Sequence, residues 1–520
     1  MNLNLSLWAI RTPAPAIVLF ILLTLAGLLG FNAMKVQDLP DIELPTVTVT
    51  ASLPGASPSQ LETEVARKLE NALATVQGVR HIYTNLSDGE ASLSIEFRLE
   101  RPIQQALDDV RDAVARVRAD LPADLRDPVI KKDELSGSPI LTYSIASSQL
   151  DAEALSWFVD NDISKTLLAV RGVGAVSRVG GVSREIRVDL DPDKLRAFHT
   201  TAADISRQLR QIQQQGSAGR TSFGGMEQSV RTIATVGSAA EIAAMDISLS
   251  DGRRIRLDQV AQVADTVSEP RSAAFLDGKA VVAFEIVRAL GYGEIEVAEG
   301  VRAALLQLRQ QKPNIQITEV FNLIDPVSEN YAGSMQLLYE GALLAVIVVF
   351  LFLRDWRATF IAATALPLSV IPTFAVMHLM GFSLNTVTLL SLSLVIGVLV
   401  DDAIVEIENI ERHLLMGKRP FQAAMEAADE IGLAVTATTF TLIAVFLPTA
   451  FMSGVIGKFF VQFGWTAAVA VLFSLLVARL LTPMMAAYLL KAPSQPVKPE
   501  PGWIRSYLKL MHWCLAHRAT

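Results

Sequence analysis

Six uncharged apolar runs constrain the fold of this chain more than any other feature of its sequence. A helix needs about 17 to 25 apolar residues to cross a hydrocarbon core of roughly 30 Å. The six runs cover residues 13–31, 337–353, 358–380, 384 to about 410, 431–452 and 459 to about 481. These runs predict a polytopic α-helical membrane protein, because a helix satisfies its backbone polar groups within lipid.

Charged residues are concentrated in residues 32–336, so the chain combines a polar part with an apolar one. A hydrophobic fraction of 51% is typical of a membrane protein with a large external domain. The net charge of −8 argues against a nucleic-acid binder, because phosphate recognition requires a basic surface. A single cysteine, Cys514, excludes a disulfide framework and the cysteine-rich class of metal site.

Lys and Arg residues in the short loops predict the orientation of the spans, because cytoplasmic loops carry an excess of them. Eleven fall on one side, and the opposite short loops hold only Lys458. The eleven are Arg11, Arg354, Arg357, Arg412, Lys418, Arg419, Lys491, Lys498, Arg505, Lys509 and Arg518. Both ends are therefore predicted to be cytoplasmic, and residues 32–336 to lie outside, in the periplasm of a Gram-negative cell.

Residues 32–336 contain an internal repeat of one supersecondary unit. An alternating apolar strand at 47–51 matches another at 141–145, and each is followed by an amphipathic helix and a Gly-Val pair. Two strands then follow in each copy, expected at 81–86 with 91–99 and at 174–179 with 184–190, before a further helix. Strand, helix, two strands, helix and strand is the ferredoxin-like order, so two α+β units are predicted.

The second unit is interrupted by a Gly-rich stretch, 216–225, and by a hairpin pattern around Asp251-Gly252, which is a strong turn signal. After the sixth run, the Pro-rich segment 491–503 is predicted to be a linker. An apolar stripe from Ile504 to Leu515 between basic residues then predicts an interfacial helix.

Acidic residues inside the fourth run carry the strongest functional signal. The segment from Gly397 to Asn409 reads GVLVDDAIVEIEN and places Asp401 and Asp402 well inside an otherwise apolar span. An ionised carboxylate near the bilayer centre costs about 2.5–3.5 kcal/mol, so two adjacent ones indicate a function.

Helical spacing puts Glu408 on the face of Asp401 and Glu406 one turn below Asp402. Carboxylates that step toward the cytoplasm are typical of a proton path. The alternatives are that the acids cap or solvate a helix end, or that they form the ring of a cation channel. A metal site is disfavoured, because no His or Cys lies on the neighbouring turns.

These motifs together resemble one family. The string GxxxDDAIVxxEN in the fourth span follows FxxM at 31–34, PxIxxPxVxV at 40–49 and PGA at 54–56. This combination is similar to the resistance-nodulation-division (RND) exporters of the hydrophobe/amphiphile efflux branch, and the resemblance covers the whole chain.

The resemblance implies a secondary active transporter rather than an enzyme, with Asp401 and Asp402 as its proton relay. Because metal exporters of the family usually keep only the first of these aspartates, Asp402 favours organic substrates. No cofactor is implied beyond the proton as coupling ion, and no metal site or substrate-binding residue is identified. The remaining motif positions are a possible proton path at Glu406 and Glu408 and motif support at Gly397 and Asn409.

The resemblance also implies how the chain is divided. The expected segments are a cytoplasmic N-terminus (1–12), the first transmembrane helix (13–31), a first porter subdomain (32–134), the first part of a second porter subdomain (135–215), half of a docking domain (216–272), the second part of the second porter subdomain (273–336), transmembrane helices two to six (337–490), and a cytoplasmic linker with an interfacial helix (491–520).

Partners follow from the same resemblance. The protein would work in the bacterial inner membrane as a homotrimer or heterotrimer, with a periplasmic adaptor protein and an outer-membrane channel, and export small amphiphilic compounds. Family members carry a second half that repeats the first, so the chain is interpreted as the N-terminal half, without its C-terminal half.

The chain departs from the family in three ways. The cations that pair with the aspartates are expected in the C-terminal half, because Arg479 is expected to reach the cytoplasmic face. Glu406 stands where drug exporters usually have an apolar residue, and the external domain lacks an evident aromatic drug pocket. Two other functions stay open: a proton-driven assistant of protein or lipid translocation, and a non-transporting membrane scaffold.

Overall fold

The structure is a computed structural model that describes residues 5–42, 45–133, 138–212, 214–223, 226–234, 236–249, 252–270, 272–491 and 502–517. The chain divides into two compact units. The first consists of Met1–Ser138, Leu290–Ile295 and Ile324–Thr520, and the second of Pro139–Ala289 and Glu296–Leu323. Each unit is described separately.

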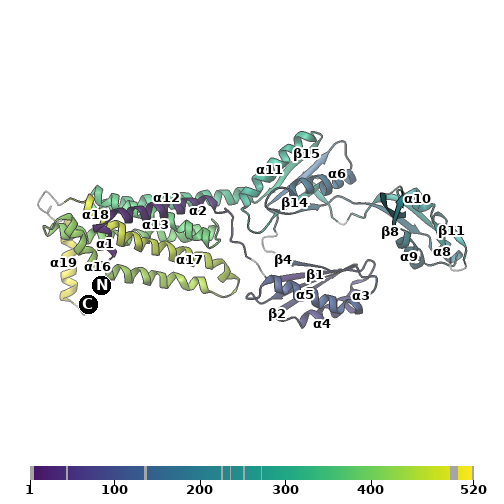
Figure 1. Cartoon of the computed structure of the whole chain (residues 1–520), viewed down its shortest axis with the longest axis horizontal. Coiled ribbons are helices and arrows are strands. Elements are labelled where there is room, and N and C mark those ends of the chain that lie inside the picture. Colours follow the sequence, from purple (N-terminus) through teal and green to yellow (C-terminus); the bar gives the residue numbers. More distant parts are fainter. Residues whose placement is uncertain are drawn as a thin grey trace. The chain divides into compact units, whose positions relative to one another are not determined.

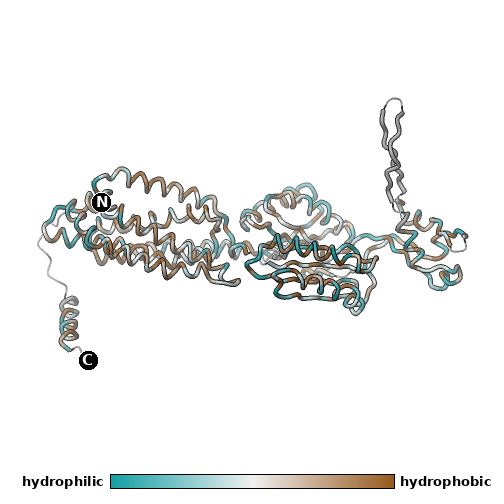
Figure 2. Tube along the Cα trace, turned by 60° about the horizontal axis from the view of Figure 1, so that its bottom comes forward, coloured by the Kyte–Doolittle hydropathy of each residue, from teal (hydrophilic) through white to brown (hydrophobic). Residues whose placement is uncertain are grey.

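Six stretches of helix in the first unit are long and apolar enough to cross a membrane, which confirms the six predicted spans. Figure 1 shows several of them side by side, and Figure 2 shows the apolar residues along their length. The helices that form them are α2 (Pro13–Ala33), α12 (Ile324–Leu353), α13 (Trp356–Leu379), α14 (Thr386–Leu399), α15 (Asp401–Leu415), α16 (Pro420–Phe446), α17 (Gly454–Leu476) and α18 (Thr482–Leu489), with a 3₁₀ turn η6 (Leu447–Phe451) and a π-helical turn η7 (Val477–Leu481).

The helices extend beyond several predicted runs. α12 begins at Ile324 and α16 at Pro420, each more than two turns before the apolar run, because polar residues continue the helix past the lipid-compatible segment. Shorter helices α1 (Leu5–Arg11) and α19 (Gly502–Ala516) flank the spans, and α19 covers the predicted interfacial stripe. The predicted linker lies almost wholly outside the described residues.

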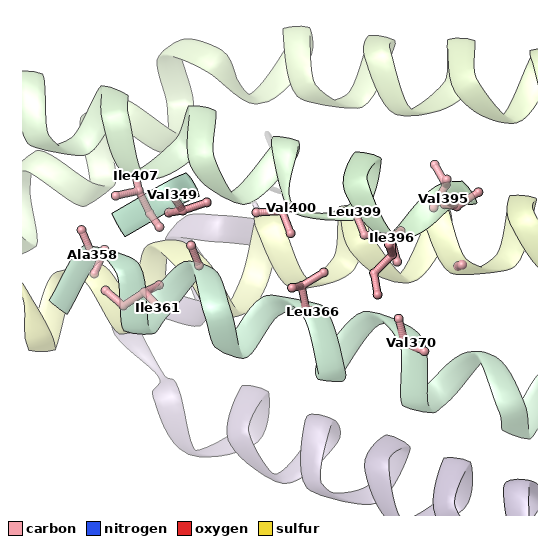
Figure 3. Close-up of a cluster of buried hydrophobic side chains, with 14 of the residues drawn as sticks. Val349, Ala358, Ile361, Leu366, Val370, Val395, Ile396, Leu399, Val400 and Ile407 are labelled. Atoms are coloured by element: carbon pink, nitrogen blue, oxygen red, sulfur yellow. The ribbon is translucent and has the colours of Figure 1, made fainter. Parts of the chain in front are cut away.

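Helix α13 forms the centre of the bundle. It packs along α2, where Gly27 and Gly30 allow the two backbones to approach closely. On another side its apolar residues meet those of the fourth span, and Figure 3 shows Leu366 and Val370 facing Val400 and Ile396. Twelve residues of α13 are buried. The fourth span is therefore held against a fixed apolar partner.

The first unit also contains a four-stranded antiparallel sheet in the order β2-β3-β1-β4. Val47, Val49 and Ala51 are buried on one face of β1, as their alternation predicts. The strands are β1 (Thr46–Ser52), β2 (Val79–Ser87), β3 (Glu90–Phe97) and β4 (Val129–Asp133), and the helical segments are α3 (Pro58–Leu61), η1 (Glu62–Ala66), α4 (Arg67–Ala74), α5 (Ile103–Val117) and η2 (Arg118–Asp120).

In the second unit the main sheet runs β13-β14-β5-β15, and β6 also pairs with β14. The two strands predicted after the second Gly-Val pair, β6 and β7, are present but do not pair with each other, because two positive-φ glycines, Gly180 and Gly181, redirect the chain between them. β7 pairs with β12 instead. The elements are β5 (Leu141–Ser147), α6 (Ala152–Phe158), η4 (Val159–Ile163), α7 (Ser164–Leu168), β6 (Val173–Val179), β7 (Arg184–Leu190), β12 (Ala261–Val267), β13 (Ala274–Leu276), β14 (Lys279–Arg288), α11 (Glu294–Gln311) and β15 (Ile315–Asn322).

A separate small core is formed mainly by residues that lie between β7 and β12 in the sequence. It gathers Ile205, Ile247, Leu257 and Val260, so it draws on both sides of the predicted boundary at residue 216. The predicted hairpin around Asp251-Gly252 is confirmed by the antiparallel pairing of β10 (Asp246–Ser248) with β11 (Arg254–Arg256), although Asp251 itself lies outside the described residues. The elements here are α8 (Pro192–Ala197), α9 (Ala202–Ile212), β8 (Gln214–Phe223), β9 (Met226–Ala234), α10 (Ala239–Ala243), β10 (Asp246–Ser248), β11 (Arg254–Arg256) and η5 (Leu257–Gln259).

Candidate functional site

The fourth span is broken at its middle, where the two aspartates lie. α14 ends at Leu399, Val400 forms a turn, and α15 begins at Asp401. Asp401 and Asp402 therefore occupy the first turn of a helix, where backbone N–H groups lack intrahelical acceptors and the helix dipole favours negative charge. The break therefore places the two carboxylates at the start of α15, within the fourth span.

Asp402 is buried between helices α16 and α17. The hydroxyl of Ser474 lies 3.3 Å from its Oδ2 atom, and the hydroxyl of Thr439 lies 3.4 Å from the same atom. Each hydroxyl also has a closer backbone acceptor, since Ser474 donates to the Leu399 carbonyl at 2.9 Å and Thr439 to the Val435 carbonyl at 2.8 Å.

A hydroxyl group has one proton to donate and can also accept. If Ser474 and Thr439 donate to their closer carbonyl acceptors, an ionised Asp402 receives no full hydrogen bond from either. A protonated Asp402 can instead donate to one of these hydroxyl oxygens. Asp402 thus lies beside two hydroxyl oxygens that could accept a hydrogen bond from it.

Asp401 lies on the opposite, exposed face of the fourth span. Gly397, Val405 and Glu408 share this face, so Glu408 lies on the side of Asp401 as predicted. A Cβ atom at Gly397 would meet no described atom within 4 Å. The exposed face therefore carries two acids and a glycine in line.

A second, buried stripe runs down the other face of α15. Asp402, Glu406, Asn409 and His413 follow one another at helical spacing and are all buried. Glu406 stacks one turn below Asp402, as the sequence predicted. The stripe thus connects the middle of the span to the end of α15.

His413 marks the end of this stripe and was missed by the sequence analysis. Its Nε2 atom lies 2.8 Å from Glu430 Oε2, and its Nδ1 atom lies 2.9 Å from Lys418 Nζ. Glu430 also accepts from Arg412 at 2.6 Å, and Asn409 donates to the Ala427 carbonyl at 3.1 Å. The signal was present, because His413 continues the spacing of Asp402 and Glu406.

The sequence matches the pattern of the AcrB/AcrD/AcrF family over residues 5–519. The chain belongs to this family. The family is that of the RND multidrug efflux permeases, so the resemblance drawn from the motifs is confirmed.

Curated relatives of the family include three proteins called multidrug resistance protein MdtC. The chain is 33% identical to that of Pectobacterium atrosepticum over 518 residues, which is 98% of this chain and 50% of the relative. It is 34% identical to that of Klebsiella pneumoniae over 528 residues, covering 98% and 50%. Identity to that of Pantoea ananatis is 34% over 493 residues, covering 94% and 48%. The chain therefore spans about half the length of these relatives.

Arg479 was expected to reach the cytoplasmic face, which stays a prediction. Its Nη1 atom donates to the Ala428 carbonyl at 2.6 Å, just before the predicted fifth apolar run, and the side chain is partly buried against α16. Arg479 projects from the π-helical turn η7, and Gly432 leaves room beside it. The bundle therefore contains a cation close to the buried stripe.

Within the described residues, no group of three or more His, Cys, Asp or Glu side chains is arranged to hold a metal ion. The acids of the fourth span point to opposite faces, so Asp401 and Asp402 do not converge on one point.

Proposed function

We propose that this chain is the N-terminal half of a permease that exports hydrophobic or amphiphilic compounds across the bacterial inner membrane, driven by the proton-motive force. The single observation that carries the proposal is the burial of the Asp402 carboxyl group beside two hydroxyl groups. A buried carboxyl group at a mid-span helix break, beside hydroxyls that can accept its proton, is suited to binding and releasing a proton.

Asp401 and Asp402 form the relay in this proposal. Asp402 takes up the proton inside the bundle, and Asp401 presents its charge on the exposed face of the fourth span. The C-terminal half would cover that face and bring cations to Asp401 and Glu408. Protonation would weaken this pairing and shift the helices, which is how a proton moves the external units.

The energy available is sufficient for export. At a potential of about 150 mV, one proton supplies roughly 3.5 kcal/mol. That energy sustains an approximately 300-fold gradient of a neutral solute. One proton per cycle is therefore enough to clear an amphiphile from the cell.

In this proposal the external units are ferredoxin-like porter subdomains, and the insertion is half of a docking domain. The element order β1, α3–α4, β2, β3, α5, β4 and the sheet order β2-β3-β1-β4 support the first assignment. The small core around Ile205 and Ile247 supports an inserted unit. Both would lie in the periplasm, with the N-terminus cytoplasmic.

We infer the assembly by analogy with the family. The complete permease would form a homotrimer or heterotrimer and join a periplasmic adaptor protein and an outer-membrane channel. The coupling ion is the proton, and no cofactor is required. The relatives' name, multidrug resistance protein, supports small amphiphilic substrates.

The test is export by cells that lack their own main efflux pumps and produce the complete protein containing this chain. Asp402→Asn is expected to slow efflux of the amphiphilic dye Nile red roughly 100-fold, the lower end of what losing a proton-transfer group costs. Glu340→Gln, which changes an exposed acid of α12, is the matched control and should export normally.

Three outcomes would contradict the proposal. Normal export by both Asp401→Asn and Asp402→Asn would remove the relay. A secretion defect with unchanged drug susceptibility would indicate an assistant of protein or lipid translocation. An absence of any phenotype in both mutants, with partner proteins still bound, would indicate a scaffold.

A further inference from the structure

Glu406 is a buried acid that the relay does not use. It is fully buried, and among the residues that the structure describes neither of its carboxylate oxygens has a hydrogen-bond partner. Burying an ionised carboxylate without a partner is far more costly than burying a neutral one. Glu406 therefore needs either a proton or a compensating positive charge.

Arg479 supplies the positive charge. It projects from η7, a π-helical turn between α17 and α18, and π-helical turns often reposition side chains at functional sites. Its guanidinium lies directly over Gly432 of α16, where an added Cβ atom would be 2.5 Å from both Nη1 and Nη2. Only a glycine at residue 432 leaves room for the guanidinium in this position.

Glu406 faces the part of α16 over which Arg479 lies. Asn409 of α15 contacts Ala427 of α16, and Asp402 contacts Thr439 of the same helix, so Glu406 between them lies opposite the turn that contains Gly432 and the Arg479 guanidinium. The acids of the adjacent helix, Asp429 and Glu430, are exposed, and Glu430 is bound by His413 and Arg412. Arg479 is thus the cation that offsets a charge on Glu406.

We propose that Glu406 is a second proton-binding group, one turn below Asp402, and that Arg479 is the countercharge that allows it to release its proton. The inference rests on the proposed proton-driven function and deepens it. With a proton on Glu406 the group is neutral, and Arg479 stays on the Ala428 carbonyl. When the proton leaves along the buried stripe toward His413, Arg479 balances the carboxylate that remains.

This pair lies within one half of the permease. The relay of Asp401 and Asp402 depends on cations from the C-terminal half, whereas Glu406 and Arg479 are both in this chain. A protonation step at Glu406 therefore needs no partner from the other half. The proton from Glu406 would then leave the buried stripe at the end of α15 that is cytoplasmic in the proposed orientation.

The test uses the complete protein in inverted membrane vesicles, in which the buffer bathes the cytoplasmic face. Nile red uptake into the vesicles is measured against buffer pH. In Arg479→Met the half-maximal pH is expected to rise by about one unit, because a carboxyl group without its countercharge releases a proton less readily. Arg479→Lys, which keeps the charge, should stay close to the unmodified protein.

Gly432→Ala is the second variant, because its Cβ displaces the guanidinium without removing it. It should reproduce the shift of Arg479→Met, and it should add nothing in a background that already carries Arg479→Met. Gly333→Ala is the matched control, since a Cβ at Gly333 of α12 meets no described atom within 4 Å. Glu406→Gln should slow uptake and remove this part of the pH dependence.

Folding is measured on the same samples by thermal unfolding. If Arg479→Met does not fold, the double variant Glu406→Met with Arg479→Met should fold, because neither buried charge is then left alone. Failure of that rescue would overturn the pairing. An unchanged pH profile in Arg479→Met, Gly432→Ala and Glu406→Gln would also overturn it. If Asp402→Asn still abolishes uptake in that case, the proposed function stands and only this inference fails.

Discussion

The hydroxyl of Ser474 lies 2.9 Å from the Leu399 carbonyl oxygen and 3.3 Å from Oδ2 of Asp402. One small side chain of α17 thus contacts both the end of α14 and the carboxyl group that follows the break. The Leu399 carbonyl belongs to the last turn of α14, where carbonyl oxygens lack intrahelical donors. Ser474 therefore stabilises the break and lies within reach of the proton-binding group.

Replacing Ser474 with Ala should affect both stability and export. The Leu399 carbonyl would lose its donor in a buried site, which costs about 1–3 kcal/mol. Asp402 would lose one of its two hydroxyl neighbours, so export should fall in addition. Thermal unfolding of the complete protein and Nile red efflux in cells measure the two effects separately.

Ser391→Ala provides the matched control. Ser391 is buried and donates to the Phe463 carbonyl at 2.9 Å, but the structure gives it no contact with Asp402. It should lose similar stability and retain export. Equal loss of export in the two variants would show that Ser474 acts through packing alone.

Gly27 should be intolerant of any side chain. A Cβ atom there would lie 2.1 Å from the carbonyl oxygen of Ile371 in α13, so α2 and α13 would have to separate. Overpacking of this kind typically costs about 1–3 kcal/mol. We expect Gly27→Ala to lower the thermal unfolding midpoint, and Gly333→Ala to leave it unchanged. Equal midpoints for the two variants would contradict the close approach of α2 and α13.

Glu319 should make the stability of the second unit sensitive to acid. Burial raises the pKa of Glu319, but hydrogen bonds from Arg302 at 3.1 Å and Tyr143 at 2.7 Å outweigh that effect and hold the pKa below its usual value. The pKa of Glu319 is therefore lower in the folded state than in the unfolded state, where it is about 4.3. Ionised Glu319 stabilises the folded state above that pH, and this stabilisation is lost as the pH falls through the folded-state pKa.

Hydrogen exchange of β15 in the complete protein measures this loss. Protection should fall as the pH drops below about 4.3, and Glu319→Gln should weaken that pH dependence. Glu299→Gln, an exposed acid on α11, should leave the dependence intact. Identical profiles for the two variants would contradict the role of Glu319.

Tyr143 should make the same unit sensitive to alkali. Burial, and then its hydrogen bond to Glu319, raise the pKa of Tyr143. A raised pKa stabilises the folded state below the unfolded value of about 10, and the contribution is lost as pH rises above it. Tyr143→Phe should therefore reduce the loss of β15 protection above about pH 10. A full alkaline loss in that variant would assign it to another group.

The spacing of apolar and charged residues along the sequence predicted much of this fold. The six spans, the buried alternation of β1, and the opposite faces of Asp401 and Asp402 all follow from spacing along the sequence. His413 also follows the helical spacing of Asp402 and Glu406. It was overlooked because its partners Glu430 and Lys418 come from another helix and a loop.

Other features depend on contacts between residues far apart in the sequence, which spacing alone does not predict. No Pro marks the break at Val400, where the hydroxyl of Ser474 on a distant helix satisfies the Leu399 carbonyl. The position of Arg479 depends on a π-helical turn and on space beside Gly432. The pairing of β7 with β12 joins strands separated by the inserted unit.

The most direct test of the central claim is proton movement through the complete protein in proteoliposomes. Addition of Nile red should start proton flux in the unmodified protein, read by a pH-sensitive dye inside the vesicles. Asp402→Asn, reconstituted to the same density, should bind Nile red, but adding Nile red should start no proton flux. Equal flux in the two proteins would contradict the assignment of Asp402 as the proton-binding group.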